Sequence, residues 1–340
     1  MMRSTENVIT ENNVNNLESA KKKITIQIFL YVIISFGIMY VTGAFYLKKD
    51  GYLVKHNLTE VSNFLYLLGI FSPLIACMIL RYSSGEGFKD GIMLPKFTGH
   101  FMWYFIAVLA PLFMGLIGCL LVTCSLHAGF SFKNDYSFFV NMLNPAISLD
   151  MVYFNMFILL GEELGWRAYL YDKLEKFFRS KGSRTDNNGK HIYNNSEDAV
   201  SYEKYSDENV SGVDKRAVSL SIIIGGTLWG LWHAQLVVVS GLNYGKDYAG
   251  YPYVGIILMC ISCIFMGAFL QLLRKKTDSV IAPTLAHAVI DSCIPVITSM
   301  FLSGNESGNI QFTFGIYGLL VPAIVAGIPS WYLLLRESRK

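Results

Sequence analysis

"FMWYFIAVLAPLFMGLIGCLLVTCSL" is the sequence of residues 101–126, and it contains no charged side chain. An α-helix rises about 1.5 Å per residue, so a helix of roughly 20 apolar residues crosses a hydrocarbon core of about 30 Å. This stretch therefore predicts a membrane-spanning helix, and stretches like it decide the fold of the chain.

Apolar stretches of similar length recur along the sequence, so we predict an all-α, polytopic membrane bundle. None of them alternates apolar and polar residues with period two, the pattern of a membrane β-barrel. We expect about eight transmembrane helices; the second is short and charge interrupts the fourth, so seven or nine remain alternatives. The predicted spans are residues 24–46, 62–80, 101–126, 149–171, 219–240, 253–273, 278–302 and 312–335.

Composition and charge placement agree with this interpretation. Hydrophobic residues make up 53% of the 340 residues, charged residues only 16%, and the mean hydropathy is +0.40, whereas soluble domains average about 25% charged residues. With a cytoplasmic N-terminus, 22 of the 28 Lys and Arg residues fall inside, 5 fall outside and Arg167 lies within a span. Because cytoplasmic loops are rich in Lys and Arg, both termini are expected in the cytoplasm. The net charge of +3 then reflects topology and does not indicate nucleic-acid binding.

Four regions are expected along the chain. The Asn- and Lys-rich composition, without a targeting signal, favours an integral protein of a bacterial cell membrane. Within the third region, the polar stretch 181–216 has no helical stripe and predicts a flexible cytoplasmic loop. The regions are a polar N-terminal tail at 1–23, disordered over 1–20; transmembrane helices without motifs at 24–148; a helical core with the ionisable residues at 149–302; and a last transmembrane helix with a basic tail at 303–340.

Six ionisable residues lie inside the predicted spans, where a charged group at the centre costs about 2.5–3.5 kcal/mol. Their spacing is helical, because one pair on the fourth span and one pair on the seventh are each separated by four residues and so share a helix face. They are Glu162, Glu163 and Arg167 in "LLGEELGWRAYL" (159–170), His233, and His287 with Asp291.

Glu163 and Arg167 can therefore form an ion pair that reduces the cost of burying both. Glu162 is rotated by about 100° from Glu163, so this ion pair need not occupy it. By the same spacing, Asp291 can orient the imidazole of His287. On the fifth span, Gly226 and Gly230 lie one turn apart, which favours close packing against another helix.

A carboxylate that faces two imidazoles suits the activation of water. Glu162 can take a proton from water, while His233 or His287 holds that water or stabilises the developing oxyanion. The same residues together with Asp291 could instead bind a divalent metal such as zinc, since two histidines and a carboxylate form a catalytic zinc pattern. No H-E-x-x-H string is present, so an ordinary zinc peptidase is not indicated. Both alternatives remain open at this point.

Three short motifs resemble those of a known family, the CAAX-protease and bacteriocin-processing group of intramembrane endopeptidases, related to the type II CAAX prenyl endopeptidase. "EELGWR" (162–167) matches E-E-x-x-x-R, and "HAVID" (287–291) matches H-x-x-x-N/D. "WGLWH" (229–233) matches an aromatic residue followed by His four positions later, with Trp229 where Phe is more usual. Ser279 and Pro283 in the lead-in "RKKTDSVIAPTLAH" also match, and the resemblance covers roughly 155–295.

The resemblance implies a role for each motif residue. Glu162 would activate water, shared with His233, and Glu163 would pair with Arg167 to hold the helix geometry. His287 and Asp291 would lie where the oxyanion is stabilised. The CAAX enzymes have Asn where this chain has Asp291, and an ionised aspartate cannot donate a hydrogen bond to an oxyanion. Asp291 must therefore be protonated, orient the histidine or bind metal.

The sequence therefore predicts an intramembrane endopeptidase that acts on a membrane-associated or lipidated peptide or protein. Its partners are the substrate and the lipid bilayer. A divalent metal, zinc, is an open alternative as cofactor. Two other functions remain: a catalytically silent membrane scaffold or bacteriocin immunity protein, and a proton-coupled transporter, since transporters also place carboxylate and histidine relays in the membrane.

Overall fold

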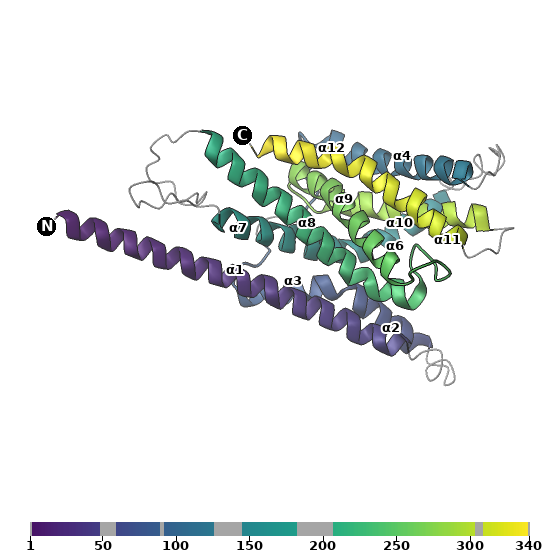
Figure 1. Cartoon of the computed structure of the whole chain (residues 1–340), viewed down its shortest axis with the longest axis horizontal. Coiled ribbons are helices and arrows are strands. Elements are labelled where there is room, and N and C mark those ends of the chain that lie inside the picture. The colour runs from purple at the N-terminus through teal and green to yellow at the C-terminus, as the bar shows by residue number, and fades with distance from the viewer. Residues whose placement is uncertain are drawn as a thin grey trace.

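A computed structural model of the chain describes residues 2–47, 59–88, 92–125, 145–181, 207–302 and 309–338. The regular elements among these residues are all helices. The prediction of an all-α fold is therefore confirmed for the described part of the chain. In Figure 1 most helices run roughly side by side along the long axis of the molecule, with α1 (Met2–Leu47) along one edge and α12 (Val321–Glu337) near the other.

Five helical segments are long and apolar enough to cross a membrane, and a bent pair of helices raises the number to six. The predicted integral membrane protein is confirmed, whereas eight spans are not established by these segments. The five are α1, α4 (Phe101–Ser125), α8 (Asp207–Ser240), α9 (Tyr253–Thr277) and the segment Gln311–Glu337 within α11 (Asn309–Phe314), η3 (Gly315–Leu320) and α12.

The span predicted at 62–80 is broken rather than straight. It consists of α2 (Thr59–Ile70) and α3 (Ser72–Ser83), whose axes differ by 55°. Pro73 lies in the first turn of α3, where its missing N–H is tolerated but its ring cannot continue the preceding helix. The break brings the start of α3 into the interior, where Ser72 is fully buried.

Two helices begin in polar sequence, well before the apolar spans predicted at 24–46 and 219–240. α1 begins at Met2, so the prediction of a disordered tail over residues 1–20 is wrong. α8 begins at Asp207, so the last ten residues of the predicted loop 181–216 are helical, while 182–206 lie outside the described residues. Extending an existing helix costs far less than nucleating one, so an apolar span can carry polar residues into its own helix.

The charged span predicted at 149–171 belongs to one long helical segment. It consists of α6 (Pro145–Gly165), a π-helical turn η2 (Trp166–Leu170) and α7 (Tyr171–Lys181). α10 (Ile281–Leu302) packs against α6 and also against α4, while α7 packs against α8. The three helices that carry the motifs are thereby brought into one bundle.

The glycines of α8 allow its close contact with α9. A Cβ on Gly226 would lie 2.4 Å from Ile264 Cα, and one on Gly230 would lie 2.4 Å from Cys260 Cα. Such distances exclude any larger side chain without a shift of the helices, so the prediction of close packing at this glycine pair is confirmed. α9 also packs against α12, which places it between two other spans.

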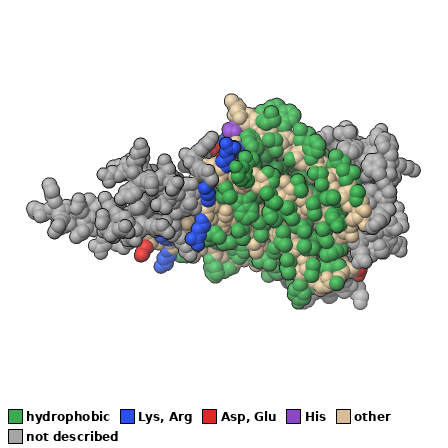
Figure 2. Space-filling view, turned by 45° about the horizontal axis from the view of Figure 1, so that its top comes forward, with side chains coloured by type: hydrophobic (Ala, Val, Ile, Leu, Met, Phe, Trp, Pro, Cys, Tyr) green, Lys and Arg blue, Asp and Glu red, His purple; other side chains and the backbone are tan. Residues whose placement is uncertain are grey.

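A layer of charged side chains marks one end of the bundle. Figure 2 shows a row of Lys and Arg side chains along the border of a broad hydrophobic surface. Such a border is expected where hydrocarbon gives way to headgroups and water. The ion pairs at this end are Glu86–Lys173, Asp172–Arg274, Glu175–Lys275, Lys276–Glu337 and Lys96–Asp278.

Candidate active site

The last turn of α6 places two glutamates in the protein interior. Glu162 is 4% exposed and Glu163 is 0% exposed. Gly165 lets this turn approach α3, because a Cβ there would lie 2.6 Å from Pro73 Cβ. The π-helical turn η2 follows at once, and π-helical turns often occur at functional sites because they re-aim the side chains around them.

Glu163 connects α6 to α10. Its Oε2 lies 3.2 Å from Arg167 Nε, one turn further along the same segment. Its Oε1 accepts a hydrogen bond from His287 Nδ1 at 2.8 Å. The sequence predicts that His287 lies with Glu162 and that Glu163 pairs only with Arg167, whereas in the structure the Glu163 carboxylate contacts both His287 and Arg167.

Trp229 on α8 contacts residues of all three motifs. Its indole Nε1 donates a hydrogen bond to Glu162 Oε2 at 3.1 Å. The guanidinium of Arg167 lies over its ring at 3.8 Å from the centroid, a cation–π contact. The rings of His233 and His287 lie 5.6 Å and 5.2 Å from it, both in edge-on arrangements. Trp229 therefore joins α6, α8 and α10 at one point.

His233 is held in one tautomer by its own helix. Its Nδ1 lies 2.9 Å from the carbonyl oxygen of Trp229. A carbonyl can only accept, so Nδ1 carries the proton, and Nε2 of the neutral ring keeps its lone pair. Trp232 packs against the same imidazole at 4.8 Å, and its Nε1 donates to Ser72 Oγ at 3.0 Å. Among the described residues, no hydrogen bond joins Glu162 directly to either histidine.

The start of α10 is fixed by the segment that precedes α4. Ser279 Oγ donates to Leu94 O at 2.8 Å and accepts a hydrogen bond from the Ile281 N–H at 3.1 Å. The N–H of Val280 donates to Ile92 O at 2.9 Å. These contacts set how deep α10 begins, and hence the level of the histidine in its second turn. Ser279 belongs to the lead-in that the sequence analysis noted before the third motif.

Asp291 lies at the edge of this cluster. Its side chain is 42% exposed, and Oδ1 lies 3.8 Å from His287 Nε2, beyond hydrogen-bond length. His287 Nδ1 is already bonded to Glu163, so the residue that orients the imidazole in this structure is Glu163. The next residue of α10, Ser292, accepts a hydrogen bond from Asn155 of α6 at 3.1 Å and holds the two helices together.

The residues proposed as metal ligands do not form a cation site in this arrangement. Those candidates are Glu162, His233, His287 and Asp291. No group of three or more His, Cys, Asp or Glu side chains among the described residues is placed to hold a metal ion. This donor set therefore does not fit zinc, and we derive no reaction step through a metal.

Two contacts in the site are not among those predicted from the sequence, namely the indole N–H bond to Glu162 and the bond between Glu163 and His287. The first had a signal, since Trp229 stands where Phe is more usual and brings a hydrogen-bond donor that Phe lacks. The bond between Glu163 and His287 had no sequence signal. It depends on how α10 is rotated relative to α6, and the residue spacing within either helix gives no information about that rotation.

Fold and site together define an integral membrane helix bundle with a buried cluster of carboxylates, imidazoles and one guanidinium. A family model described as "Type II CAAX prenyl endopeptidase Rce1-like" matches residues 200–293. This segment contains Trp229, His233, His287 and Asp291, and the "EELGWR" motif precedes it. Over residues 200–293, the predicted resemblance to the CAAX-protease family is thereby confirmed. A comparison with curated proteins found no match.

Proposed function

We propose that this protein is an intramembrane endopeptidase whose water nucleophile is activated by Glu162 and His233. The observation that carries the proposal is the hydrogen bond from Trp229 Nε1 to Glu162 Oε2. It holds one carboxylate oxygen and leaves Oε1 without a hydrogen-bond partner among the described residues. A buried carboxylate with one fixed and one available oxygen, bonded to the indole that both imidazoles contact, suits a general base.

In the proposed reaction, Glu162 takes a proton from water as the water oxygen attacks the scissile carbonyl carbon. The C–N bond then breaks, and Glu162 passes this proton to the leaving amine nitrogen. His233 Nε2 accepts a hydrogen bond from the second O–H of the same water, because Nδ1 already donates to the Trp229 carbonyl. His287 supports the oxyanion when Nε2 carries a proton, since Nδ1–H is held by Glu163.

We further propose that the substrate is a membrane-associated or lipidated peptide or protein. The motif residues lie on helices within an apolar bundle, so a substrate has to reach them through or along the bilayer. The family model that matches residues 200–293 describes prenyl endopeptidases, which supports a lipid-linked or membrane-bound substrate. The proposed location is a bacterial cell membrane.

The proposed topology has eight spans with both termini in the cytoplasm. The five long apolar helices and the bent α2–α3 pair supply six, and α6 and α10 supply two more. Figure 1 supports a common side for the termini, because the start of α1 and the end of α12 point toward the same end of the bundle. The charged layer described above lies at that end.

The test compares membrane proteins of cells that carry the wild type with those of cells that carry Glu162→Gln or His233→Ala. We expect both variants to abolish cleavage of native substrates, with a loss of about 10²–10⁴-fold in rate, because removing a general base has that effect. Quantitative membrane proteomics should detect the same uncleaved proteins in both variants.

Glu18→Gln is the matched control, since Glu18 is an exposed carboxylate at the start of the first span. It should leave cleavage unchanged. Elution in detergent as a single folded species shows that each variant still folds. Unchanged cleavage products in folded Glu162→Gln would contradict the proposal and favour a scaffold or immunity role.

A further inference from the structure

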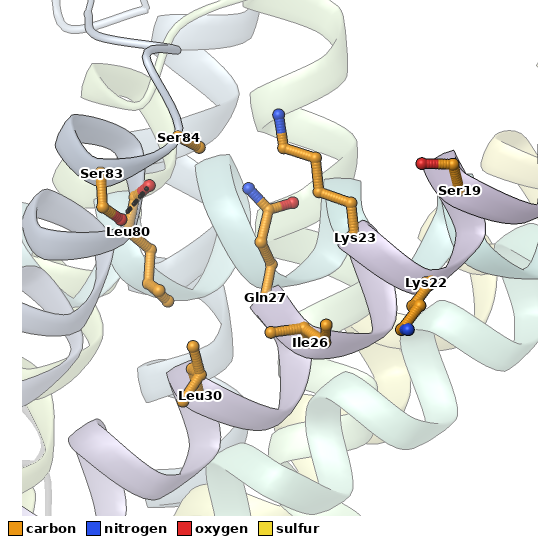
Figure 3. Close-up of a pocket in the computed structure, with 9 residues that line it drawn as sticks. All are labelled: Ser19, Lys22, Lys23, Ile26, Gln27, Leu30, Leu80, Ser83 and Ser84. Atoms are coloured by element: carbon orange, nitrogen blue, oxygen red, sulfur yellow. Dashed lines mark hydrogen bonds between the residues drawn. The ribbon is translucent and has the colours of Figure 1, made fainter. Parts of the chain in front are cut away.

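A groove of about 370 Å³ lies between the first turns of the apolar part of α1 and the end of α3. Figure 3 shows Gln27, Ile26 and Leu30 of α1 facing the end of α3, with the Lys23 side chain rising beside them. The lining residues of α1 repeat at three- and four-residue spacing, so they form one face of that helix. The groove is lined by Ser19, Lys22, Lys23, Ile26, Gln27, Leu30, Leu80, Ser83 and Ser84.

The groove is polar at one end and apolar at the other. Along α1, the face changes from Lys22 and Lys23 to Ile26 and Leu30 within about 12 Å of helix. Ile26 and Leu30 are 47% and 38% exposed, although both are apolar. This change occurs at the start of the membrane span Glu18–Ala44. The groove therefore lies where headgroups meet acyl chains.

The lysines of the groove differ from five ion-paired cations at this end of the bundle. Lys96, Lys173, Arg274, Lys275 and Lys276 each form an ion pair with a carboxylate. Lys22 and Lys23 form no ion pair with any described residue and are both exposed. Among the described residues, these two positive charges therefore have no ion-pair partner.

The carboxylate of Glu86, which bonds to Gln27 of the groove, does not neutralise these two lysines. Glu86 Oε1 accepts hydrogen bonds from Lys173 Nζ at 2.6 Å and from Gln27 Nε2 at 2.9 Å. Burial alone raises the pKa of Glu86, but these hydrogen bonds outweigh it and hold the pKa below its ordinary value. The charge of Glu86 is thus already compensated by Lys173, and the groove keeps a positive excess.

We propose that this groove binds the phosphate headgroup of an anionic phospholipid, with the lysine ammonium groups on the phosphate and the upper acyl chain on Ile26, Leu30 and Leu80. Lysines near a membrane surface attract anionic lipids by about 1 kcal/mol each. The hydroxyl of Ser19 adds a donor for a phosphate oxygen, whereas those of Ser83 and Ser84 already donate to Leu80 O and Arg81 O. The apolar lining formed by Ile26, Leu30 and Leu80 favours a lipid over a free phosphate, because a free phosphate has no apolar group to contact it. The proposal does not depend on proteolytic activity.

The test is native mass spectrometry of the full-length protein released from nanodiscs that contain equal amounts of phosphatidylglycerol and phosphatidylcholine. Wild type should retain phosphatidylglycerol. The double variant Lys22→Gln/Lys23→Gln should retain it roughly 10- to 30-fold less, the loss expected for two lysines at a surface. The matched control Lys215→Gln/Arg216→Gln removes two charges from the start of the α8 span, away from the groove, and should retain wild-type binding.

Two further experiments distinguish a phospholipid from free inorganic phosphate as the bound ligand. Ile26→Ala/Leu30→Ala keeps every charge and should also reduce lipid retention, because the acyl chain loses apolar contacts with these two side chains. Millimolar inorganic phosphate should not displace the lipid. Equal retention by both charge variants would mean general lipid attraction and overturn the proposal. Displacement by inorganic phosphate, or full retention by Ile26→Ala/Leu30→Ala, would overturn the lipid assignment.

Discussion

At the scale of single residues, Trp229 connects the parts of the candidate site. Its indole N–H donates a hydrogen bond to Glu162, and its ring makes a cation–π contact with Arg167. Both histidine rings lie against the same indole. A phenylalanine could make the ring contacts but not the hydrogen bond. One substitution, Trp229→Phe, can therefore remove the hydrogen bond while keeping the ring contacts.

Trp229→Phe should lower kcat/KM by about 2- to 10-fold without loss of folded protein, because a single hydrogen bond contributes about 0.5–1.5 kcal/mol. Trp232→Phe is the matched control on the same helix, since it removes a bond to Ser72 instead. It should reduce thermal stability and leave kcat/KM nearly unchanged. Equal effects of the two variants on kcat/KM would show that Trp229 acts only through packing.

The fully buried pair of Glu163 and Arg167 should matter first for folding. Arg167→Ala leaves the Glu163 carboxylate buried with one partner fewer, and breaking a buried ion pair typically costs about 3–5 kcal/mol. We expect a low yield and a lower melting temperature in detergent, measured by intrinsic fluorescence. The double variant Glu163→Gln/Arg167→Met should be more stable than Arg167→Ala, because it leaves no uncompensated charge. A double variant as unstable as Arg167→Ala would contradict this account.

At the scale of elements, the contact between α8 and α9 determines where Trp229 and His233 lie. Gly230→Ala should destabilise the protein, because the added Cβ would lie 2.4 Å from Cys260 Cα and the helices would have to separate. Overpacking of this kind costs about 1–3 kcal/mol. Thermal unfolding in detergent measures the loss, and activity should fall with it because Trp229 is the adjacent residue.

Gly37→Ala provides the control for this prediction. Gly37 lies in α1, and a Cβ there would meet nothing within 4 Å. Alanine favours a helix over glycine by about 1 kcal/mol, so this variant should be neutral or slightly stabilising. A similar loss of stability in both glycine variants would show that backbone flexibility, rather than close packing, decides the effect.

At the scale of the whole molecule, the proposed topology places the segment between α8 and α9 outside the cell and the end of α12 inside. Lys246→Cys should therefore react with a membrane-impermeant maleimide in intact cells. Ser338→Cys should react only after the membrane is permeabilised. The wild type supplies the background of the native cysteines, of which Cys124 is exposed. Labelling of Ser338→Cys in intact cells would exclude a cytoplasmic C-terminus.

Much of the helical architecture could be predicted from local sequence. A stretch such as 101–126 has to be a helix in a bilayer, because only intrasegment hydrogen bonds satisfy its backbone there. The ends of helices could not be predicted as well. Met2 and Asp207 begin helices in polar sequence because a neighbouring span had already nucleated them, and the bend before Pro73 shortened one span.

The sequence by itself determined that this chain is a membrane protein, that its described part is all-helical, and which ionisable residues its interior has to accommodate. Hydrophobicity and the spacing of four residues within a helix are local properties, so Glu163 and Arg167 could be paired in advance. Only the tertiary structure decided that His287 bonds to Glu163 and that Trp229 bonds to Glu162. Those contacts depend on how three helices rotate and slide against each other, which is set by close packing at residues such as Gly230 across the whole bundle.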